Sequence, residues 1–336
     1  MKEIYLNNYG QFLGKKSERL VVKEKGKIKR EEPFFKISRV IITSKGISLS
    51  TDAIEECMKR GIQIDFLNFK NEPYAKLSSP FLQGTVKTRR AQLTAFDDQR
   101  GVSLAKAFVL GKVSNQVNLL KYMSKYRKKR NPEIYNYMCK RIKEIEKMIN
   151  EISVIEDEKI DFIRQDIMTL EAHAAKKYWQ TVAKILPEEV GFTGRETRGA
   201  VDLVNSMLNY GYAILYSHVQ GAVILAGLDP FAGFMHVDRS GRASLVLDFV
   251  EEFRQQTVDK TIFAMINRGT NLEVKENRLT KKTKNKFRKK LKKKFDSYHQ
   301  YEGKKEKIKN IIQRQARHIA THLRGEREYE PFVGSW

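Results

Sequence analysis

The sequence has few cysteines and no long apolar run. Only Cys57 and Cys139 occur among 336 residues, and they lie far apart, which argues against a disulfide framework and against a cysteine metal site. No run of about 18 apolar residues is present, so we expect no transmembrane helix. The first residues, MKEIYLNNYGQF, lack the apolar core of a signal peptide. These absences together predict a protein of the reducing cytoplasm.

Phosphate-binding loops and nucleophile motifs are also missing. Neither G-x-x-x-x-G-K-[ST] nor G-x-G-x-x-G occurs in the sequence, so chemistry driven by ATP has no support. No G-x-S-x-G elbow is present and no cysteine lies beside a histidine motif, which makes nucleophilic catalysis less favoured. Metal-assisted chemistry is the class that remains.

Positive charge is abundant. Lys and Arg number 64 against 40 Asp and Glu, which gives a formal net charge of +24. Such an excess creates a field that attracts polyanions, and nucleic acid is the usual partner. A membrane surface is less favoured because the basic stretches do not adjoin an apolar anchor. A plain basic bias without a polyanionic partner stays open as an alternative.

Two hydrophobic periods divide the chain. Residues 1–80 contain short β-branched and aromatic runs around one helix, which begins near Asp52 and ends before Gly61. From residue 91 to residue 336, apolar residues recur every three or four positions, as helices require. The sequence predicts an α+β protein with a small N-terminal β-sheet domain (1–80), a linker (81–90) and a mostly α-helical domain (91–336).

A strongly basic stretch covers residues 279–309. Phe287, Leu291 and Phe295 fall four apart in it, which predicts an amphipathic basic helix. A solvated lysine face is the alternative, but the net charge of the chain favours contact with phosphates. The candidate DNA-binding lysines on this helix are Lys289, Lys290, Lys292 and Lys293.

A first candidate for chemistry is Glu171, in IDFIRQDIMTLEAHAAKKYWQ. It lies at the edge of a helical apolar stripe that includes Ile167 and Ala174. A carboxylate drawn against packed surface needs a partner, and an ion pair with Lys or Arg is the structural alternative to a catalytic role.

A second candidate region is GLDPFAGFMHVDRSGRASLVLDFVEEFRQ, residues 227–255. His236 precedes a helix on which Asp248 and Glu251 lie three apart, opposite an apolar stripe, which suggests a buried polar pocket. One imidazole with several carboxylates suits Mg²⁺ or Mn²⁺ and is a poor closed zinc site. His318 and His322 have the spacing of a zinc pair but no third ligand nearby, so we interpret them as part of a helix face.

Several segments resemble a known family. LEAHAAKKYW at 170–179 and GLDPFAGFMHVDRSGRASLVLDFVEEFR at 227–254 closely resemble the signature segments of the CRISPR-associated integrase, the metal-dependent DNA endonuclease of spacer acquisition. GIQIDFLN, KVSNQVNLL and VNSMLNYGYAIL match as well, in the same order along the chain. Several long motifs in order are far more specific than a lone glycine pattern.

The resemblance implies an N-terminal β domain that forms a homodimer, a C-terminal helical domain, and a small ferredoxin-like partner subunit. Carried onto this sequence, the metal ligands are Glu171, His236 and Glu251, with Asp248 as a further acid at the site. Glu252 is a less favoured alternative to Glu251. Two arginines close to His236 in sequence are candidates for contacting the scissile phosphate, Arg239 and Arg242.

The function that the resemblance implies is insertion of captured DNA fragments into a CRISPR array. A 3′-hydroxyl of the fragment would attack a phosphodiester of the target by direct transesterification, and water in its place would give nuclease activity. Two other hypotheses stay open. One is a DNA-binding scaffold whose carboxylates form only structural ion pairs, and the other is a repair nuclease acting on branched DNA.

Overall fold

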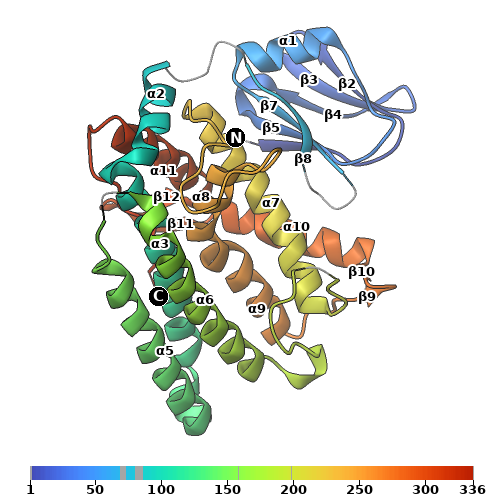
Figure 1. Cartoon of the computed structure of the whole chain (residues 1–336). Helices are drawn as coiled ribbons and strands as arrows, with labels where there is room; N and C mark the ends of the chain where they lie inside the picture. Colours follow the sequence, from blue (N-terminus) through green and yellow to red (C-terminus); the bar gives the residue numbers. More distant parts are fainter. Residues whose placement is uncertain (1, 69–72, 80–85, 158, 198, 336) are drawn as a thin grey trace. The chain divides into compact units, whose positions relative to one another are not determined.

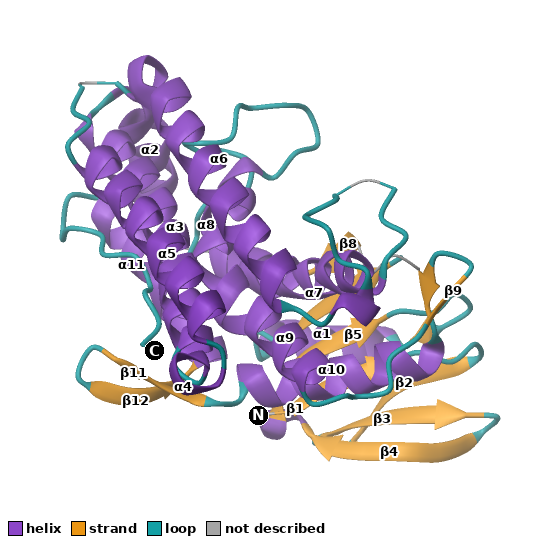
Figure 2. Cartoon of the chain, turned by 90° about the horizontal axis from the view of Figure 1, so that it is seen from below, coloured by secondary structure: helices purple, strands orange, loops and turns teal. Residues whose placement is uncertain are grey.

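The chain divides into two units, Met1–Gly84 and Thr85–Trp336. The computed structural model describes residues 2–68, 73–79, 86–157, 159–197 and 199–335. Strands dominate the first unit and helices the second, which confirms the predicted α+β class (Figures 1 and 2).

The N-terminal unit contains a sheet with the strand order β1-β5-β7-β8. Its first three strands are parallel, and β8 pairs antiparallel with β7. β-branched residues such as Val40 and Ile64 suit strands that are buried on the core side. The strands are β1 (Lys2–Leu6), β5 (Ile37–Ile42), β7 (Gln63–Leu67) and β8 (Pro73–Leu77).

A second sheet in this unit has the order β4-β3-β2-β6. Helix α1 (Thr51–Lys59) begins at Ser50, whose hydroxyl accepts a hydrogen bond from Ala53 N. Asp52, near which the sequence predicts the start of this helix, lies in its first turn. The remaining elements of the unit are β2 (Gln11–Lys16), β3 (Arg19–Glu24), β4 (Lys27–Pro33), the 3₁₀ turn Phe34–Lys36 and β6 (Ser48–Leu49).

The predicted linker is partly helical. Residues 86–90 begin α2 (Val86–Thr94), so the linker prediction is wrong for them. This segment follows Gly84 and is rich in Lys, Arg, Ala, Gln and Leu, which favour helix. Gln92 and Thr88 are buried in the helical unit and hold α2 there. The rest of the predicted linker, residues 81–85, lies outside the described residues.

Long helices form the body of the C-terminal unit. Helix α3 is central: it packs against α5, α6 and α8, while α7 packs against α8 and α11 (Figure 1). The apolar positions spaced three and four apart in the sequence lie in one shared core, which includes Val113, Tyr178 and Leu215. The principal helices are α3 (Gln99–Ser124), α5 (Pro132–Ser153), α6 (Ile160–Ile185), α7 (Leu203–Leu225), α8 (Ser244–Arg254) and α11 (Ile308–Leu323).

Shorter elements complete this unit. The basic helix predicted from the sequence is α10 (Lys281–Phe295), with Phe287, Leu291 and Phe295 buried. The other elements are α4 (Arg127–Arg130), α9 (Lys260–Asn267), the π-helical turn Gln255–Asp259, the 3₁₀ turns Ala95–Asp97 and Glu188–Val190, and the hairpins β9–β10 (Val274–Lys275, Arg278–Leu279) and β11–β12 (Tyr298–Tyr301, Lys304–Lys307). Within the described residues, no helix combines the length and the apolar character needed to cross a membrane.

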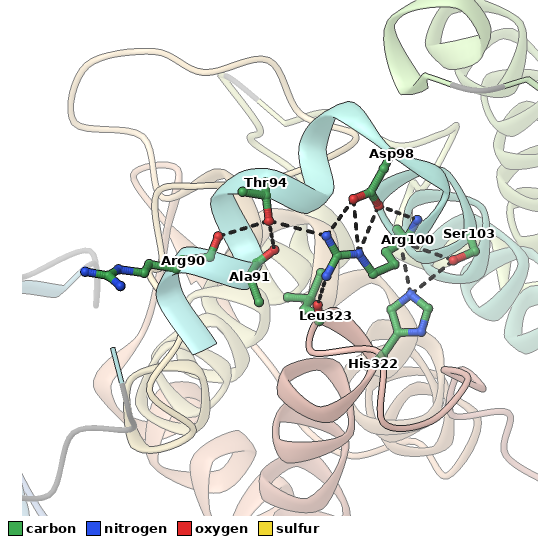
Figure 3. A network of polar contacts seen from close by, with 8 residues as sticks. All are labelled: Arg90, Ala91, Thr94, Asp98, Arg100, Ser103, His322 and Leu323. Atoms are coloured by element: carbon green, nitrogen blue, oxygen red, sulfur yellow. Dashed lines mark hydrogen bonds and ion pairs between the residues drawn. The ribbon is translucent and has the colours of Figure 1, made fainter. Parts of the chain in front are cut away.

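A polar network joins the start of α3 to the end of α11. Asp98 caps α3 by accepting from Arg100 N at 2.9 Å, and the Arg100 guanidinium also donates to the carbonyl of Leu323 (Figure 3). The His322 imidazole lies 3.0 Å from both Ser103 Oγ and the Arg100 carbonyl oxygen (Figure 3). His318 faces Tyr301 instead, at 3.2 Å. The two histidines therefore make structural contacts of a helix face.

Candidate active site

Helix α6 presents Glu171 at the margin of the core. Ile163, Ile167, Ala174 and Tyr178 form its buried stripe, which fixes the rotation of the helix about its axis. Glu171 lies beside this stripe, with about one fifth of its side chain exposed (21%). The stripe thus places a carboxylate where protein surrounds it on most sides.

Helix α3 supplies a cation to this carboxylate. Lys112 stands next to the buried Val113, and its side chain is only 14% exposed. Its Nζ lies 2.5 Å from Glu171 Oε1 and 2.9 Å from Glu251 Oε2. One ammonium group therefore holds carboxylates from two different helices, α6 and α8. We call Lys112, Glu171 and Glu251 the carboxylate pocket.

Glu251 is the most buried acid of the carboxylate pocket. Burial acts to raise its pKa, but the charges of Arg254 and Lys112 outweigh burial and hold that pKa below its ordinary value. Arg254 Nη1 lies 3.1 Å from Glu251 Oε1. The other oxygen, Oε2, is buried and accepts no directed hydrogen bond from the described residues, although the Lys112 ammonium is close. Glu251 is therefore an ionised buried carboxylate with one oxygen incompletely satisfied.

His236 is oriented by Asp248. The buried Asp248 accepts hydrogen bonds from the backbone N–H groups of Phe234 and Met235 through Oδ2, and from that of His236 through Oδ1. Oδ1 also lies 2.6 Å from His236 Nδ1. Because a carboxylate only accepts, Nδ1 carries the proton of this contact, which leaves Nε2 as the ring nitrogen that does not contact Asp248. Histidines that bind metals are commonly oriented in this way.

The segment that carries His236 is held from three helices. Besides Asp248 on α8, Gln92 on α2 donates to the carbonyls of Asp229 and Ala232, both at 2.8 Å. Arg164 on α6 donates to the carbonyl of Phe234. A side chain at Gly233 would come within 2.6 Å of Ser244, so glycine permits this loop to lie against the start of α8. The position of His236 is thus set by tertiary contacts.

Two roles expected from the sequence change in the structure. Asp248 is not a free acid of the site, because both of its oxygens are taken up by the backbone of 234–236 and by the imidazole. Glu252 does not join the carboxylate pocket. It accepts from Tyr329 Oη at 2.7 Å and Phe332 N at 2.9 Å, and burial raises its pKa to about 8. Glu252 follows Glu251 on α8, and consecutive helical residues face different directions, so Glu252 points to the chain segment after α11.

Sequence reasoning missed Lys112 and Arg254. Both lie inside segments that resemble the family. Lys112 is a single cation among apolar and small residues, whereas Arg254 lies three residues after Glu251 on the same helix. A lone lysine beside Val113 was a usable signal, because a charge next to a buried stripe needs an opposite charge. Which carboxylates it would meet depends on how the helices pack.

The donors that would suit a divalent cation are divided between two neighbouring parts of the site. The described residues contain no group of three His, Cys, Asp or Glu side chains gathered closely enough to hold a metal. One part is the carboxylate pocket, with its under-satisfied Glu251 oxygen, and the other is the His236–Asp248 pair, whose Nε2 is available. A positive charge on the His236 imidazole acts to lower the pKa of Glu251, so the two parts lie close to one another. Oxygen donors with one imidazole are the set that Mg²⁺ and Mn²⁺ accept.

Basic side chains lie both near His236 and on α10. Arg239 is exposed and Arg242 half-buried, and no ion pair joins either guanidinium to an acid among the described residues. On α10, Lys289, Lys290 and Lys293 are exposed, and Lys292 is half-buried. The structure therefore leaves the predicted DNA-contacting cations accessible, and it places those of α10 opposite the buried Phe287 and Leu291.

A second buried network supports the carboxylate pocket. Asp259, on the π-helical turn, accepts from Tyr178 Oη at 2.8 Å and from Tyr212 Oη at 2.6 Å. The Arg254 guanidinium lies over the Tyr212 ring, 4.6 Å from its centroid. Burial raises the pKa of Asp259 to about 6, even though the two hydroxyls favour its ionised form. Arg254 thus connects this network to Glu251.

Comparison with known proteins identifies the family. The profile of the family described as CRISPR associated protein Cas1 matches residues 4–324, which places the chain among CRISPR-associated proteins. The chain belongs to the Cas1 family, so the resemblance seen in the sequence is confirmed. A CRISPR-associated endonuclease Cas1 from Archaeoglobus fulgidus is 41% identical over 345 residues, which cover 99% of each chain.

Solved structures share the fold. A casposase bound to integration product has a TM-score of 0.81 and 26% identity, covering 99% of this chain and 93% of the other. A chain of a Cas6-RT-Cas1–Cas2 complex has a TM-score of 0.74 and 19% identity, covering 98% of this chain and 36% of the other. The two-unit architecture is therefore that of known Cas1 structures.

The Asp259 network predicts a pH dependence of stability. The folded state raises the pKa of Asp259 from 3.8 to about 6, so the stability that this group contributes is present below the unfolded pKa and is lost as pH rises towards 6. Relative to Asp259→Asn, the wild type should lose roughly 2–3 kcal/mol of unfolding free energy between about pH 4 and pH 6 and stay level above it. Urea unfolding of both proteins across this range measures the difference, and a constant difference would contradict the prediction.

Proposed function

We propose that this protein is a metal-dependent DNA endonuclease and integrase that inserts captured DNA fragments into a CRISPR array by transesterification. The observation that carries the proposal is the meeting of Glu171 and Glu251 around one cationic group, next to a histidine whose Nδ1 is fixed by Asp248. Curated relatives named endonucleases and the casposase bound to integration product support the same activity.

Glu171, His236 and Glu251 would hold the Mg²⁺ or Mn²⁺ ion. A divalent cation bound by these residues would supply charge stabilisation for a phosphodiester under attack and would activate a 3′-hydroxyl or water. Asp248 keeps Nε2 of His236 free to bind. Arg254 keeps Glu251 ionised, and its stack on Tyr212 restricts its movement. Arg239 and Arg242 are the cations next in sequence to His236 and would contact the phosphate chain.

Two other functions compete with this one. A DNA-binding scaffold would use Lys112, Glu171 and Glu251 as a structural ion pair only, and the ion pair that this hypothesis requires is present. The scaffold hypothesis does not explain why Nε2 of His236 is free and why one Glu251 oxygen is incompletely satisfied. A repair nuclease would use the same pocket on branched DNA. Comparison of strand transfer with cleavage of branched duplexes separates it from an integrase.

Removing a proposed ligand tests the site. Glu171→Ala, His236→Ala and Glu251→Ala should each reduce strand transfer and cleavage in Mn²⁺ by more than about a hundredfold, beyond the loss usual for groups that only support a ligand. Duplex binding should be kept, because removing an acid does not weaken attraction to phosphates. A labelled fragment and a repeat-containing plasmid report the reaction.

The matched control for these variants is Glu133→Ala, which removes an exposed acid from α5. It should leave both reactions unchanged. Full strand transfer by Glu171→Ala in Mn²⁺ would contradict the assignment of Glu171 as a metal ligand and favour the DNA-binding scaffold.

Helix α10 should bind the phosphate backbone. Reversing Lys289, Lys290, Lys292 and Lys293 to Glu should weaken binding to all duplex sequences alike, because interactions with phosphates carry no base information. The salt dependence of binding should fall by about 0.9 in slope for each phosphate that the variant no longer neutralises. Phe287 and Leu291 remain buried, so the variant should stay folded.

The control reverses the same number of lysines in the N-terminal unit, where Lys16, Lys25, Lys27 and Lys29 are exposed. Both variants carry the same net charge, so a difference between them reports direct binding by α10 and not overall attraction. Fluorescence anisotropy across a salt series measures both. If the salt dependence of duplex binding is unchanged in the α10 variant, these lysines form a solvated face and do not bind phosphates.

We further propose that the protein works in the cytoplasm as a homodimer formed by its β units, with a small ferredoxin-like subunit. Both cysteines are free, which supports a reducing compartment. A structure of the same fold comes from a complex that includes Cas2, and an analogous subunit would serve here. The N-terminal unit exposes large apolar side chains, among them Phe35 (69%) and Tyr74 (67%), as a self-association surface requires.

The dimer can be tested on the full chain. Phe35→Ser combined with Tyr74→Ser should weaken self-association by at least about tenfold, because exposed aromatics of an interface contribute most of its binding energy. Phe162→Ser, an equally exposed change on α6, is the control and should leave the dimer intact. Sedimentation velocity over a concentration series gives the result. Equal weakening by both variants would contradict the assignment.

A further inference from the structure

The oxygens proposed to hold the metal are already in contact with a cation of the chain. Lys112 Nζ lies 2.5 Å from Glu171 Oε1 and 2.9 Å from Glu251 Oε2. Arg254 lies against the second oxygen of Glu251. Two carboxylates are thus matched by two cations, and the pocket is balanced in charge before any metal arrives. A divalent cation added to a balanced pocket meets repulsion from both basic groups.

We propose that Lys112 is a positioning residue that acts as a built-in counter-cation of the metal site. It holds Glu171 and Glu251 together in the metal-free protein, and it competes with the divalent cation for the same oxygens. Tight metal binding therefore requires the negative charge of a DNA phosphate, which draws Lys112 away from the carboxylates. This proposal rests on the proposed metal-dependent function and describes how metal binding at that site is regulated.

The two cations differ in their freedom to move. The Arg254 guanidinium is stacked over the Tyr212 ring, 4.6 Å from its centroid, and this contact keeps it beside Glu251. Lys112 has a flexible four-carbon chain that ends in a point charge, and it makes no stacking contact among the described residues. Its ammonium also holds only an ion pair, without a directed hydrogen bond, at Glu251 Oε2. Lys112 is the cation that can exchange with a metal.

Coupling of this kind is reciprocal. If DNA strengthens binding of the metal, the metal strengthens binding of DNA by the same factor. The pocket would then hold little metal in the free protein and acquire it together with its substrate. A lysine with a structural role alone predicts something different: its loss would lower stability and leave metal affinity unchanged or weaker.

The test measures Mn²⁺ binding to the DNA-free protein by isothermal titration calorimetry. Lys112→Met should bind Mn²⁺ about tenfold tighter than the wild type, within the usual range of coupling between sites. In EDTA the same variant should unfold at a lower temperature, because two buried carboxylates then lack their shared cation, and Mn²⁺ should reverse this loss. Lys140→Met makes the same chemical change on the exposed face of α5 and should alter neither quantity.

A second measurement uses an uncleavable duplex fragment. It should raise the Mn²⁺ affinity of the wild type by about tenfold and that of Lys112→Met much less. Glu171→Gln measured in parallel subtracts the Mn²⁺ that the DNA itself binds. If Lys112→Met does not fold in EDTA, Lys112→Gln, which keeps hydrogen-bond donors without the charge, takes its place.

The outcomes separate this proposal from the proposed function. Unchanged or weaker Mn²⁺ affinity in both Lys112 variants overturns the counter-cation and leaves the catalytic assignment standing, provided Glu171→Ala abolishes strand transfer. Strand transfer that survives Glu171→Ala overturns the proposed function itself. Tighter Mn²⁺ binding without Lys112, together with the loss of stability in EDTA, supports the counter-cation.

Discussion

The ion pair of Lys112 with Glu171 and Glu251 is the constraint on which the site depends. Two carboxylates from different helices cannot share a mostly buried space as anions unless a cation lies between them. Lys112 meets that need from a third helix, α3, which is also the central packing element of the unit. The packing of α3, α6 and α8 against one another therefore also brings the three charges of the site together.

Around this pair, the buried polar groups form connected layers. Asp248 uses both of its oxygens to fix the loop and ring of His236, and Asp259 with Tyr178 and Tyr212 supports Arg254. Buried polar networks rigidify a site only when their members are satisfied, and here nearly every oxygen has a donor. Among the described residues of these networks, Glu251 Oε2 in the carboxylate pocket and the neighbouring Arg254 Nε lack a directed hydrogen bond. The carboxylates around the site are thus satisfied except where chemistry is proposed.

The strong positive charge of the chain and the acidity of its pocket are compatible with one another. Basic surface attracts a phosphate chain over a distance of about a Debye length, whereas the pocket acts only at contact. Acids concentrated in a small buried site cost little of that attraction, particularly when Lys112 and Arg254 neutralise them locally. A basic protein can therefore carry an acidic centre without repelling its substrate.

The α+β class and the division into a β-rich and a helical part follow from the sequence alone, because hydrophobic period is a local property, and the long motifs indicated the family. Helix α10 and its buried Phe287 and Leu291 followed from spacing alone. Only the tertiary structure decided that Asp248 orients His236, that Glu252 turns to Tyr329, and that Lys112 lies between two acids. Neighbouring residues on one helix face different partners, and which partner each meets depends on how distant helices pack. Unlike hydrophobic residues in a helix or strand, charges that pair across helices do not recur at a regular spacing in the sequence, so the sequence alone does not reveal them.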